Sequence, residues 1–594
     1  MKQSALFRLI RRKTRRALRH ERTILLLLGA VAGALTGLTA IVFRLGIDEA
    51  QALFLGVRGE YITSAILALP WWRVVLGPLL GGVAVALILR LFMADHRSRS
   101  VTHVIEAVAT KGGALPLKDG LVAALISVLT LGSGGSAGRE GPIVHLAATL
   151  AANIGRVLKL NPKRNMTLLG CGVASAVAAS FNAPIAGAFF ALEVVVGSYA
   201  LDAFAPVVLA SVIGTVISRL YFGDFPAFIL PHHYGLVSFW EFPAFALLGI
   251  VCAIVAGLFM WSVLFAEKMA DRLPLPGYLL PVPAGLAVGV LALAFPQILG
   301  VGYEATDAAL KEQLPLVSML LLLVVKTMAT AITLGGRFGG GVFSPSLYLG
   351  AMTGGAFGII AAAAFPEYAA SQGVYTIVGM GAVASAVLGA PISTILIVFE
   401  MTGDYKVTIA VMLSASLASL IVHSLGARSF FHWQLRRRGI DVEDGRLRHL
   451  LSHIPVAELL RPTPAILHEQ ADIEAVRMAI MENEAGVAYI VDDDNRLRGV
   501  IALPDLKRFR TFEEESHHEA HAADVMRPCR WVLYLEQPLD QALDLLEKDV
   551  EDPIPVLNNK EEKALRGVIY QRDILLAQNR ALVQRQREQA GEGA

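Results

Sequence analysis

The sequence predicts an all-α polytopic membrane domain followed by a smaller α/β soluble domain. Of the 594 residues, 55% are hydrophobic and 17% are charged, whereas soluble domains are about 25% charged. The mean hydropathy is +0.57. Long apolar stretches stop near Leu425, and the chain beyond them is rich in charge. We therefore expect a bundle of spanning helices first and a globular domain after it.

A basic segment precedes the first predicted span. The first 22 residues carry nine Lys or Arg against one acid, Glu21, and the positive-inside rule places this end in the cytoplasm. Residues 24–43 follow without a charge, which is longer than the apolar region of a signal peptide, so we expect a retained span. Residues 1–23 are predicted to rest on anionic lipid headgroups rather than on nucleic acid.

Further apolar stretches of about spanning length recur as far as residue 440. They begin at Val74, Leu121, Met166, Phe245, Met319, Tyr375 and Thr408. Many are interrupted by Gly and Pro, which suggests half-helices whose ends meet where backbone lines protein or a water-filled cavity. Residues 24–440 are therefore predicted to form a multi-pass domain of a plasma or inner membrane.

One carboxylate lies at membrane depth. Glu140 stands in the motif G-R-E-G-P at residues 138–142, inside an apolar stretch, and ionisable residues there are functional by default. Pro142 suits the first turn of a helix, whose free N–H groups form an anion site. A carboxylate at such a site is displaced by protonation or by a permeating anion, so we predict that Glu140 is a gate. Pairing with Arg139 or with a neighbouring helix is the alternative.

The apolar region contains an internal repeat. Ala183-Pro184-Ile185 and Glu193 return 207 residues later as Ala390-Pro391-Ile392 and Glu400. A Gly-x-x-x-Pro pattern at Gly138 and Pro142 returns 203 residues later at Gly341 and Pro345. Two homologous halves, each with such a half-helix entrance, predict a pseudo-symmetric inverted-repeat transporter fold with its site where the halves meet.

The charged region also repeats. Residues 457–462 (A-E-L-L-R-P) return as 523–528 (A-D-V-M-R-P), and Gly499-Val500-Ile501 with Asp505 returns as Gly567-Val568-Ile569 with Asp573. Two such units, each with helices and β-rich runs, resemble a tandem CBS pair. The predicted divisions are a first CBS domain at 453–511, a linker at 512–522, a second CBS domain at 523–580 and a polar tail at 581–594. The linker's acids and its histidines (His517, His518, His521) are interpreted as solvated rather than metal-binding.

The membrane part strongly resembles the CLC family of chloride channels and chloride/proton exchangers. Four motifs carry the resemblance: G-R-E-G-P at 138–142, G-G-V-F-S-P at 340–345, F-N-A-P at 181–184 and E-M-T at 400–402. The resemblance implies a homodimer with one anion pathway per subunit and Glu140 as the external gating glutamate. It also implies an anion site formed by the backbone amides of Val342 and Phe343, with Gly138, Arg139 and Gly141 at the first entrance.

Two departures from the family pattern concern the side chains that hold the anion. The family's G-S-G-I-P motif, counted back without gaps, falls on residues 98–102, so Arg99 replaces the coordinating serine. The family's pore tyrosine falls on Phe431, which has no hydroxyl. Ser98, Ser100 or Thr102 would supply a hydroxyl after a local shift. Arg99 either adds its charge to the site or turns toward the cytoplasmic vestibule, which we favour because an arginine against the ion would slow its release.

A third departure concerns protons. In related exchangers an inner glutamate follows the position of Glu193, and here that position is Val194. This favours a passive anion channel with Glu193 as a structural carboxylate paired with a polar neighbour. The alternative is a chloride/proton antiporter that uses another internal proton route.

An enzyme is not expected, because no soluble nucleophile, metal cluster or phosphate loop is present. The three cysteines are scattered without metal-ligand spacing. A CBS pair suggests an adenine nucleotide as the only cofactor. However, the family's Ser or Thr three residues before the Asp is replaced by Ala502 before Asp505 and by Tyr570 before Asp573. A structural, dimer-clamping role of this pair, on the cytoplasmic side, is the equal alternative.

Overall fold

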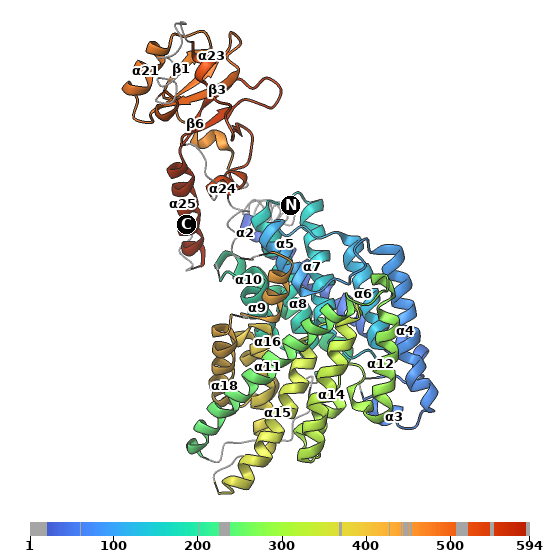
Figure 1. Ribbon diagram of the computed structural model, residues 1–594. Helices are drawn as coiled ribbons and strands as arrows, with labels where there is room; N and C mark the ends of the chain where they lie inside the picture. The colour runs from blue at the N-terminus through green and yellow to red at the C-terminus, as the bar shows by residue number, and fades with distance from the viewer. Residues whose placement is uncertain are drawn as a thin grey trace, which may run out of the picture. The chain divides into compact units, whose positions relative to one another are not determined.

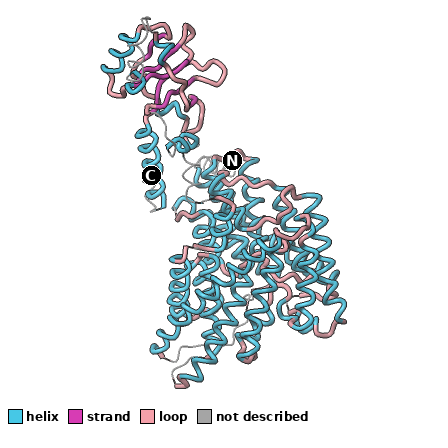
Figure 2. Tube along the Cα trace, in the orientation of Figure 1, coloured by secondary structure: helices cyan, strands magenta, loops and turns pink. Residues whose placement is uncertain are grey.

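A computed structural model gives the fold of the chain. It describes residues 21–59, 61–199, 201–224, 228, 238–367, 371–426, 428–440, 442, 451, 454–506, 521–546 and 552–589. The chain divides into two compact units, Met1–Val442 and Glu443–Ala594. The first unit is helical (Figure 1), and the strands of the described residues all belong to the second (Figure 2). Most of the basic N-terminal segment and of the 512–522 linker, including His517 and His518, lies outside the described residues.

The first unit consists of two halves of similar helix order. The first half contains α2 (Glu21–Phe54), α3 (Thr63–Ile66), α4 (Trp71–Phe92), α5 (Val101–Thr110), α6 (Leu117–Gly132), α7 (Glu140–Val157), α8 (Pro162–Phe181), α9 (Pro184–Phe190), the π-helical turn η1 (Ala191–Val196) and α10 (Leu201–Phe222). The second half contains η2 (Phe239–Glu241), α11 (Phe242–Ala270), η3 (Gly277–Leu279), α12 (Pro281–Ala294), η4 (Pro296–Ile298), α13 (Tyr303–Leu310), α14 (Leu316–Gly335), α15 (Phe343–Ala364), α16 (Gln372–Leu388), α17 (Pro391–Thr402), α18 (Tyr405–Ser424) and α19 (Phe430–Arg437).

The predicted membrane fold is confirmed. Eight helical segments of the described residues are long and apolar enough to cross a membrane: α2, α4, α10, α11, Gly277–Ala294, α14, α15 and α18. Each apolar stretch expected from the sequence lies in a helix, and the structure adds α10, α12 and α15, whose apolar stretches the sequence analysis did not name. The protein is therefore an integral, multi-pass membrane protein.

The same helix contacts occur in both halves. Helix α7 packs on α8 as α15 packs on α16, and α8 packs on α10 as α16 packs on α18. The contacts are close because glycines stand at matching positions. A Cβ on Gly172 would lie 2.6 Å from the carbonyl oxygen of Ala147, and one on Gly379 would lie 2.4 Å from that of Gly350. Small residues let membrane helices approach in this way, which supports a pair of homologous halves.

The short helices α9 and α17 begin after matching breaks in the chain. Asn182 and Gly389 end the preceding helices with φ of 59° and 65°, in the left-handed region that Gly and Asn tolerate. Pro184 and Pro391 then occupy the first turn, where the missing proline N–H has no partner to lose. The sequence repeat thus sets a repeated helix boundary.

The second unit contains two three-stranded sheets of the same plan. Their strands run in the orders β1-β2-β3 and β4-β5-β6, with the first pair parallel and the second antiparallel in each. The elements are η5 (Val456–Leu459), β1 (Ile466–His468), α21 (Ile473–Glu482), β2 (Val487–Val491), β3 (Leu497–Ala502), α23 (Ala522–Val525), β4 (Leu533–Tyr534), α24 (Asp540–Leu546), β5 (Ile554–Leu557), β6 (Leu565–Ile569) and α25 (Gln571–Gln589). The predicted α/β pair of units is confirmed.

Candidate functional site

The two half-helix entrances meet backbone to backbone. The N–H of Gly138 donates to the carbonyl oxygen of Gly341 at 2.8 Å, and the N–H of Gly341 donates back to Gly138 at 2.9 Å. Reciprocal bonds of this kind are expected where a two-fold pseudo-axis relates the partners. Neither residue has a side chain to hold the backbones apart, so this geometry brings the starts of α7 and α15 together.

A second reciprocal pair of bonds supports each entrance. The N–H of Ser136 donates to Thr333 Oγ1 at 3.2 Å, and the N–H of Gly339 donates to Thr130 Oγ1 at 3.0 Å. These residues occupy equivalent places in the two halves, and all four are buried. Buried backbone donors require partners, so the threonines at the ends of α6 and α14 fix the loops that lead into α7 and α15.

Glu140 begins α7 and is only 1% exposed. Its Oε1 accepts a hydrogen bond from Ser344 Oγ at 2.6 Å and another from Tyr303 Oη at 3.3 Å, while Arg139 Nε lies 4.0 Å away. Its Oε2 is buried without a hydrogen-bond partner among the described residues. The carboxylate thus reaches across to the opposite entrance, and one of its oxygens is left unsatisfied.

A cavity adjoins this carboxylate and gathers most of the residues that the sequence singled out. Its lining includes Ser98, Arg99, Ser100, Glu140, Gly141, Val342, Phe343 and Phe431. Gly138 and Arg139 are not part of that lining. Gly138 lies behind it against Gly341, and the guanidinium of Arg139 stacks on the Tyr303 ring, 5.0 Å from its centroid. The structure therefore unites four chain segments that are up to about 330 residues apart.

The start of α15 supplies backbone donors to the cavity. Val342 is the residue before the helix and Phe343 is its first residue, so their N–H groups have no partner within the helix. The Phe343 ring packs against Phe181 and Phe190, with centroid separations of 4.7 and 5.9 Å. This aromatic packing fixes the position of the helix start. The direction of the two N–H groups is then set by the backbone and does not depend on the side chains.

Only some of the candidate hydroxyls near residues 98–102 are free. Thr102 Oγ1 donates to Gln434 Oε1 at 2.6 Å. Ser98 Oγ is buried and has no hydrogen-bond partner among the described residues. Ser100 lines the cavity as the residue that precedes α5. Since Phe431 offers no hydroxyl, Ser98 and Ser100 are the residues of the 98–102 segment whose hydroxyl groups line the cavity.

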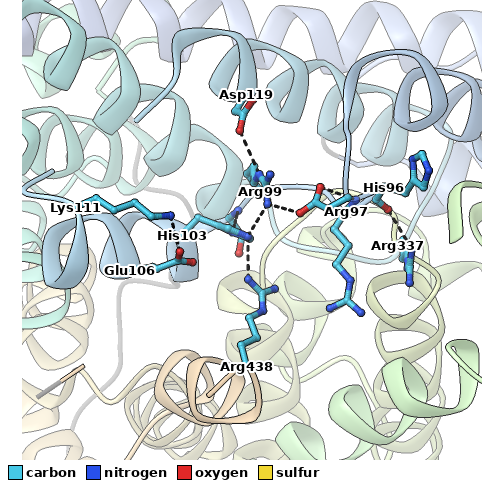
Figure 3. Close-up of polar contacts among 11 residues, drawn as sticks. His96, Arg97, Arg99, His103, Glu106, Lys111, Asp119, Arg337 and Arg438 are labelled. Atoms are coloured by element: carbon cyan, nitrogen blue, oxygen red, sulfur yellow. Dashed lines mark hydrogen bonds and ion pairs between the residues drawn. The ribbon is translucent and has the colours of Figure 1, made fainter. Parts of the chain in front are cut away.

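Arg99 is held by carboxylates rather than by the entrances. Its Nη1 lies 2.6 Å from Asp95 Oδ2, and its Nε lies 3.5 Å from Asp119 Oδ2 (Figure 3). Two nearby arginines also have a carboxylate partner, because Arg97 and Arg337 share Asp271 at 3.2 and 2.8 Å. The cavity thus carries a cluster of basic side chains at the Arg99 end, partly balanced by acids.

Arg438 and His103 also lie at the Arg99 end of the cavity. Figure 3 shows Arg438 and Arg99 directed toward the ring of His103. Arg438 Nη1 lies 2.9 Å from His103 Nε2, and Arg99 Nη1 lies 3.3 Å from the same atom. The other ring nitrogen, Nδ1, lies 3.2 Å from the N–H of Ser100. His103 therefore stands among donors at the start of α5.

Glu193 and Glu400 each cap a short helix of the other half. Glu193 caps the start of α17, which carries Glu400, and Glu400 caps the start of α9, which leads into the turn that carries Glu193. Glu193 accepts hydrogen bonds from the N–H groups of Ile392 and Ser393, at 3.1 and 2.8 Å, and from the Ser393 hydroxyl. Glu400 accepts from the N–H groups of Ile185 and Ala186 at 2.9 and 2.8 Å. These bonds agree with the expectation of a structural carboxylate paired with polar neighbours. Val194 is buried beside Glu193 and does not line the cavity.

In the second unit, each aspartate flagged in the sequence pairs with an arginine of the other repeat. Arg527 Nε donates to Asp505 Oδ2 at 2.8 Å. Arg461 donates to both oxygens of Asp573, at 3.2 and 3.3 Å. The arginines come from the matching R-P motifs, so the two repeats exchange equivalent ion pairs. Both carboxylates are already engaged within the protein.

The sequence analysis gave no role to several residues of the site, among them the basic cluster around Arg438. Ser344 stood inside a quoted motif without a role, and Tyr303 lies 163 residues from Glu140, so no local pattern links them. His103 and His145 are ionisable residues in apolar stretches, which is a signal that the sequence did carry. Glu140, Gly141, Val342 and Phe343 were found from motifs that depend on backbone geometry. Ser98, Arg99, Ser100 and Phe431 were instead placed by counting along the family pattern.

Comparisons with known proteins give the family. The family model for voltage gated chloride channels matches residues 81–423, and the CBS domain model matches 456–511 and 522–580. A ClcB-like chloride channel protein of Ralstonia nicotianae is 32% identical and spans 70% of this chain and 98% of the relative. Chloride channel protein CLC-f of Arabidopsis thaliana is 31% identical over 85% of this chain and 72% of its own.

A solved structure shares the fold. The crystal structure of a slow cyanobacterial Cl−/H+ antiporter superposes with a TM-score of 0.62 at 24% identity, and covers 70% of this chain and 98% of its own. The match to the channel family model, together with these relatives, supports one assignment. This chain belongs to the CLC family of chloride channels and transporters and carries a pair of CBS domains after its membrane domain.

Proposed function

We propose that this protein carries chloride or a similar anion through the cavity, with Glu140 as the gate. The observation that carries the proposal is the position of the Glu140 carboxylate between the two entrances, bonded to Ser344 of the second half. A carboxylate at the start of a helix occupies the place where an anion is most stable. Protonation removes its charge, and the side chain then yields the place to a permeating anion.

The anion's proposed ligands are mainly backbone groups. The amides of Val342 and Phe343 at the start of α15 are the central donors, with Gly138 and Gly141 allowing close approach of the first entrance. Ser98 supports the proposal further, because its buried hydroxyl has no hydrogen-bond partner in the part of the chain that the structure describes, and such a group costs free energy unless a ligand satisfies it. Ser100 is the alternative donor at the same end of the cavity.

Arg99 is proposed to act from the cytoplasmic vestibule rather than as an anion ligand. Its ion pairs with Asp95 and Asp119 hold the guanidinium at its end of the cavity and partly cancel its positive field. The positive field of the remaining cluster raises the local concentration of anions at the cavity mouth. In this role Arg99 does not contact the bound anion, so the anion leaves the central site without breaking an ion pair.

Two modes of transport follow from different residues. Passive conduction is favoured by Val194, since a hydrocarbon side chain at that position cannot hand a proton inward. Proton-coupled exchange is the second candidate, and a specific observation favours it. A buried histidine, His145, lies on the same helix as Glu140, and its Nδ1 has no hydrogen-bond partner among the described residues. Movement of an anion, gated by Glu140, is common to both modes, and no catalytic role is proposed.

The second unit is proposed to clamp a homodimer from the cytoplasmic side. Asp505 and Asp573 would face a nucleotide ribose in a ligand-binding CBS pair, but both accept hydrogen bonds from arginines of the other repeat. A structural role therefore has more support than adenine nucleotide binding. Unchanged thermal stability of the purified protein on addition of AMP, ADP or ATP is the expected result, and saturable stabilisation by one of them would establish a nucleotide site.

The experiment that tests the proposed function is reconstitution of the purified chain in liposomes. Vesicles loaded with chloride are diluted into a chloride-poor buffer with valinomycin and potassium, so that charge movement does not limit the flux. A chloride electrode then records efflux, and empty liposomes give the background. Efflux above background supports anion transport. Background-level efflux from well-folded protein at every pH tested contradicts it.

A further inference from the structure

The cavity is one of two hollows that adjoin the gate. The second hollow is lined by residues of α2, by residues around α3 and by part of the segment 299–304, among them Tyr303, together with Arg139. Of the described residues, none lines both hollows. Helix α5 at the cavity and helix α3 at the second hollow lie toward opposite ends of the membrane domain (Figure 1). The second hollow is therefore placed to continue the path of an anion beyond the cavity.

One hydrogen bond joins the walls of the two hollows. Glu140 lines the cavity, Tyr303 lines the second hollow, and Tyr303 Oη donates to Glu140 Oε1 at 3.3 Å. The two residues are 1% and 4% exposed. The Tyr303 ring also contacts the guanidinium of Arg139, 5.0 Å from the ring centroid, and the ring of Phe228, whose centroid is 5.1 Å away. A bond between the two halves of the domain thus lies at the boundary between the hollows.

The polar neighbours of the Glu140 carboxylate favour its ionised form. Of the described side chains, Arg139 of the same helix, Ser344 of α15 and Tyr303 of α13 face it, at 4.0, 2.6 and 3.3 Å from Oε1. A hydroxyl donor stabilises a carboxylate more than it stabilises the neutral acid. The Tyr303 hydroxyl therefore holds Glu140 in the anion's place while the side chain is charged, and holds it less firmly after protonation.

A buried lysine holds the segment that leads to Tyr303. Lys326 of α14 is 0% exposed, and its Nζ donates to the carbonyl oxygens of Ile298 and Gly300 at 2.9 Å each. No carboxylate of the described residues pairs with it, and its other contact is the Tyr348 ring, 5.1 Å from Nζ. Both the ammonium and the neutral amine carry the two protons that these bonds need. Because a lysine at membrane depth is costly, its use on this one segment points to a role there.

The held segment has little freedom. Gly300 and Gly302 have φ of 60° and 91°, in the left-handed region that glycine tolerates. The N–H of Gly300 donates to the carbonyl oxygen of Gly134, in the loop that leads into α7, at 3.3 Å. A Cβ on Gly302 would lie 3.3 Å from Lys326 Nζ. Since Gly302 precedes α13 and Tyr303 is its first residue, the bonds of Lys326 set where the Tyr303 side chain begins.

We propose that Tyr303 is the second half of the gate, a latch that holds the ionised Glu140 at the boundary between the hollows, and that Lys326 is the positioning residue of this latch. The proposal rests on the proposed anion transport with Glu140 as the gate, and it adds the groups that keep the gate closed. Without the Tyr303 hydroxyl, the ionised carboxylate loses a donor, so Glu140 takes up its proton and opens the path at a higher pH. Loss of Lys326 acts through Tyr303 and has the same direction.

The test is chloride efflux from liposomes as a function of pH. Efflux from the parent is expected to rise as the pH falls, and the pH of half-maximal efflux is its midpoint. Tyr303→Phe removes only the hydroxyl, so the midpoint should move upward by about 0.5–1 pH unit, as expected for one long hydrogen bond to a carboxylate. Lys326→Met should move the midpoint in the same direction by the same amount or less. The double variant should move it no further than Tyr303→Phe alone, because Lys326 acts through Tyr303.

Three further variants support the comparison. Lys326→Gln covers the case in which Lys326→Met does not fold, because its amide stays polar but ends one bond short of Nζ and so loosens the same two bonds. Tyr375→Phe is the control for loss of a tyrosine hydroxyl, since the buried Tyr375 packs against the rings of Phe245 and Phe357 instead. Lys311→Met is the control for loss of a lysine, since Lys311 binds Asp307 at the far end of α13. Both controls should keep the parent's midpoint.

Each failure has its own signature. An unchanged midpoint in Tyr303→Phe overturns the latch and leaves the anion transport standing. Additive shifts in the double variant overturn the positioning role, because Lys326 would then act on the gate without Tyr303. An unchanged midpoint in the Lys326 variants overturns that role as well. Parent efflux that does not change with pH contradicts the gate at Glu140 and the latch together, whereas background-level efflux contradicts the proposed anion transport itself.

Discussion

Gly138 and Gly341 exchange two backbone hydrogen bonds, of 2.8 and 2.9 Å, at the point where the two halves of the membrane domain meet. They are equivalent residues of the internal repeat, so one bonded pair defines the pseudo-symmetry and the location of the site together. There is little room for a side chain at this contact between the two entrances. A Cβ on Gly341 would lie 3.0 Å from the nitrogen of Gly141 and 3.1 Å from its Cα.

Gly341→Ala should therefore separate the two entrances. The added methyl meets backbone, which cannot move aside as a flexible side chain can, and overpacking of this kind costs about 1–3 kcal/mol. We expect chloride efflux from liposomes to fall by about an order of magnitude, with a lower unfolding temperature. Gly257→Ala is the control, because nothing lies within 4 Å of a Cβ there. Equal efflux from the two variants would mean that the entrances do not need this contact.

Arg99→Ser tests the vestibule role. Loss of the guanidinium leaves Asp95 and Asp119 without their partner and makes the cavity mouth more negative. We expect chloride transport at low ionic strength to fall roughly two- to tenfold, and the loss to shrink at high ionic strength, where the field is screened. The exposed Arg58, paired with Glu49 away from the cavity, provides the control Arg58→Ser. A loss that is independent of ionic strength would instead indicate direct contact between Arg99 and the anion.

Phe431→Tyr should give the cavity a new side-chain donor. The ring already lines the cavity, and a hydroxyl directed into it adds a hydrogen bond worth about 0.5–1.5 kcal/mol. Chloride binding measured by isothermal titration calorimetry is expected to become roughly two- to tenfold tighter. Phe365→Tyr, at an exposed ring, should leave the affinity unchanged. Unchanged or weaker binding by Phe431→Tyr would place the anion out of reach of residue 431.

The sequence predicted those parts of the site that depend on backbone geometry. The Gly-x-x-x-Pro patterns at Gly138 and Gly341 mark positions where only glycine permits two backbone segments to approach. Their repetition therefore predicted both the two-fold repeat of the fold and the position of the gate. Glu193 was recognisable in the same way from its repeat mate Glu400. Each of these predictions rested on two positions with the same physical requirement.

Contacts that depend on tertiary approach were not predictable. Nothing near Tyr303 in the chain shows that its hydroxyl reaches Glu140, and counting along residues 98–102 left the hydroxyl donor open. The start of α5 at Val101 and the bond from Thr102 to Gln434 narrow that choice to Ser98 and Ser100. Such contacts depend on how helices that are distant in the sequence pack together. The spacing of hydrophobic residues along the sequence does not determine that packing.

The gate itself is tested most directly by chloride efflux from liposomes as a function of pH, with Glu140→Gln beside the parent. Glutamine keeps the shape of the side chain but carries no charge at any pH, so it cannot compete as an anion for the helix starts. The parent is expected to change its efflux with pH as Glu140 takes up a proton, and Glu140→Gln to lose that dependence while the protein remains folded. If the variant keeps both the parent's rate and the parent's pH dependence, Glu140 is not the gate.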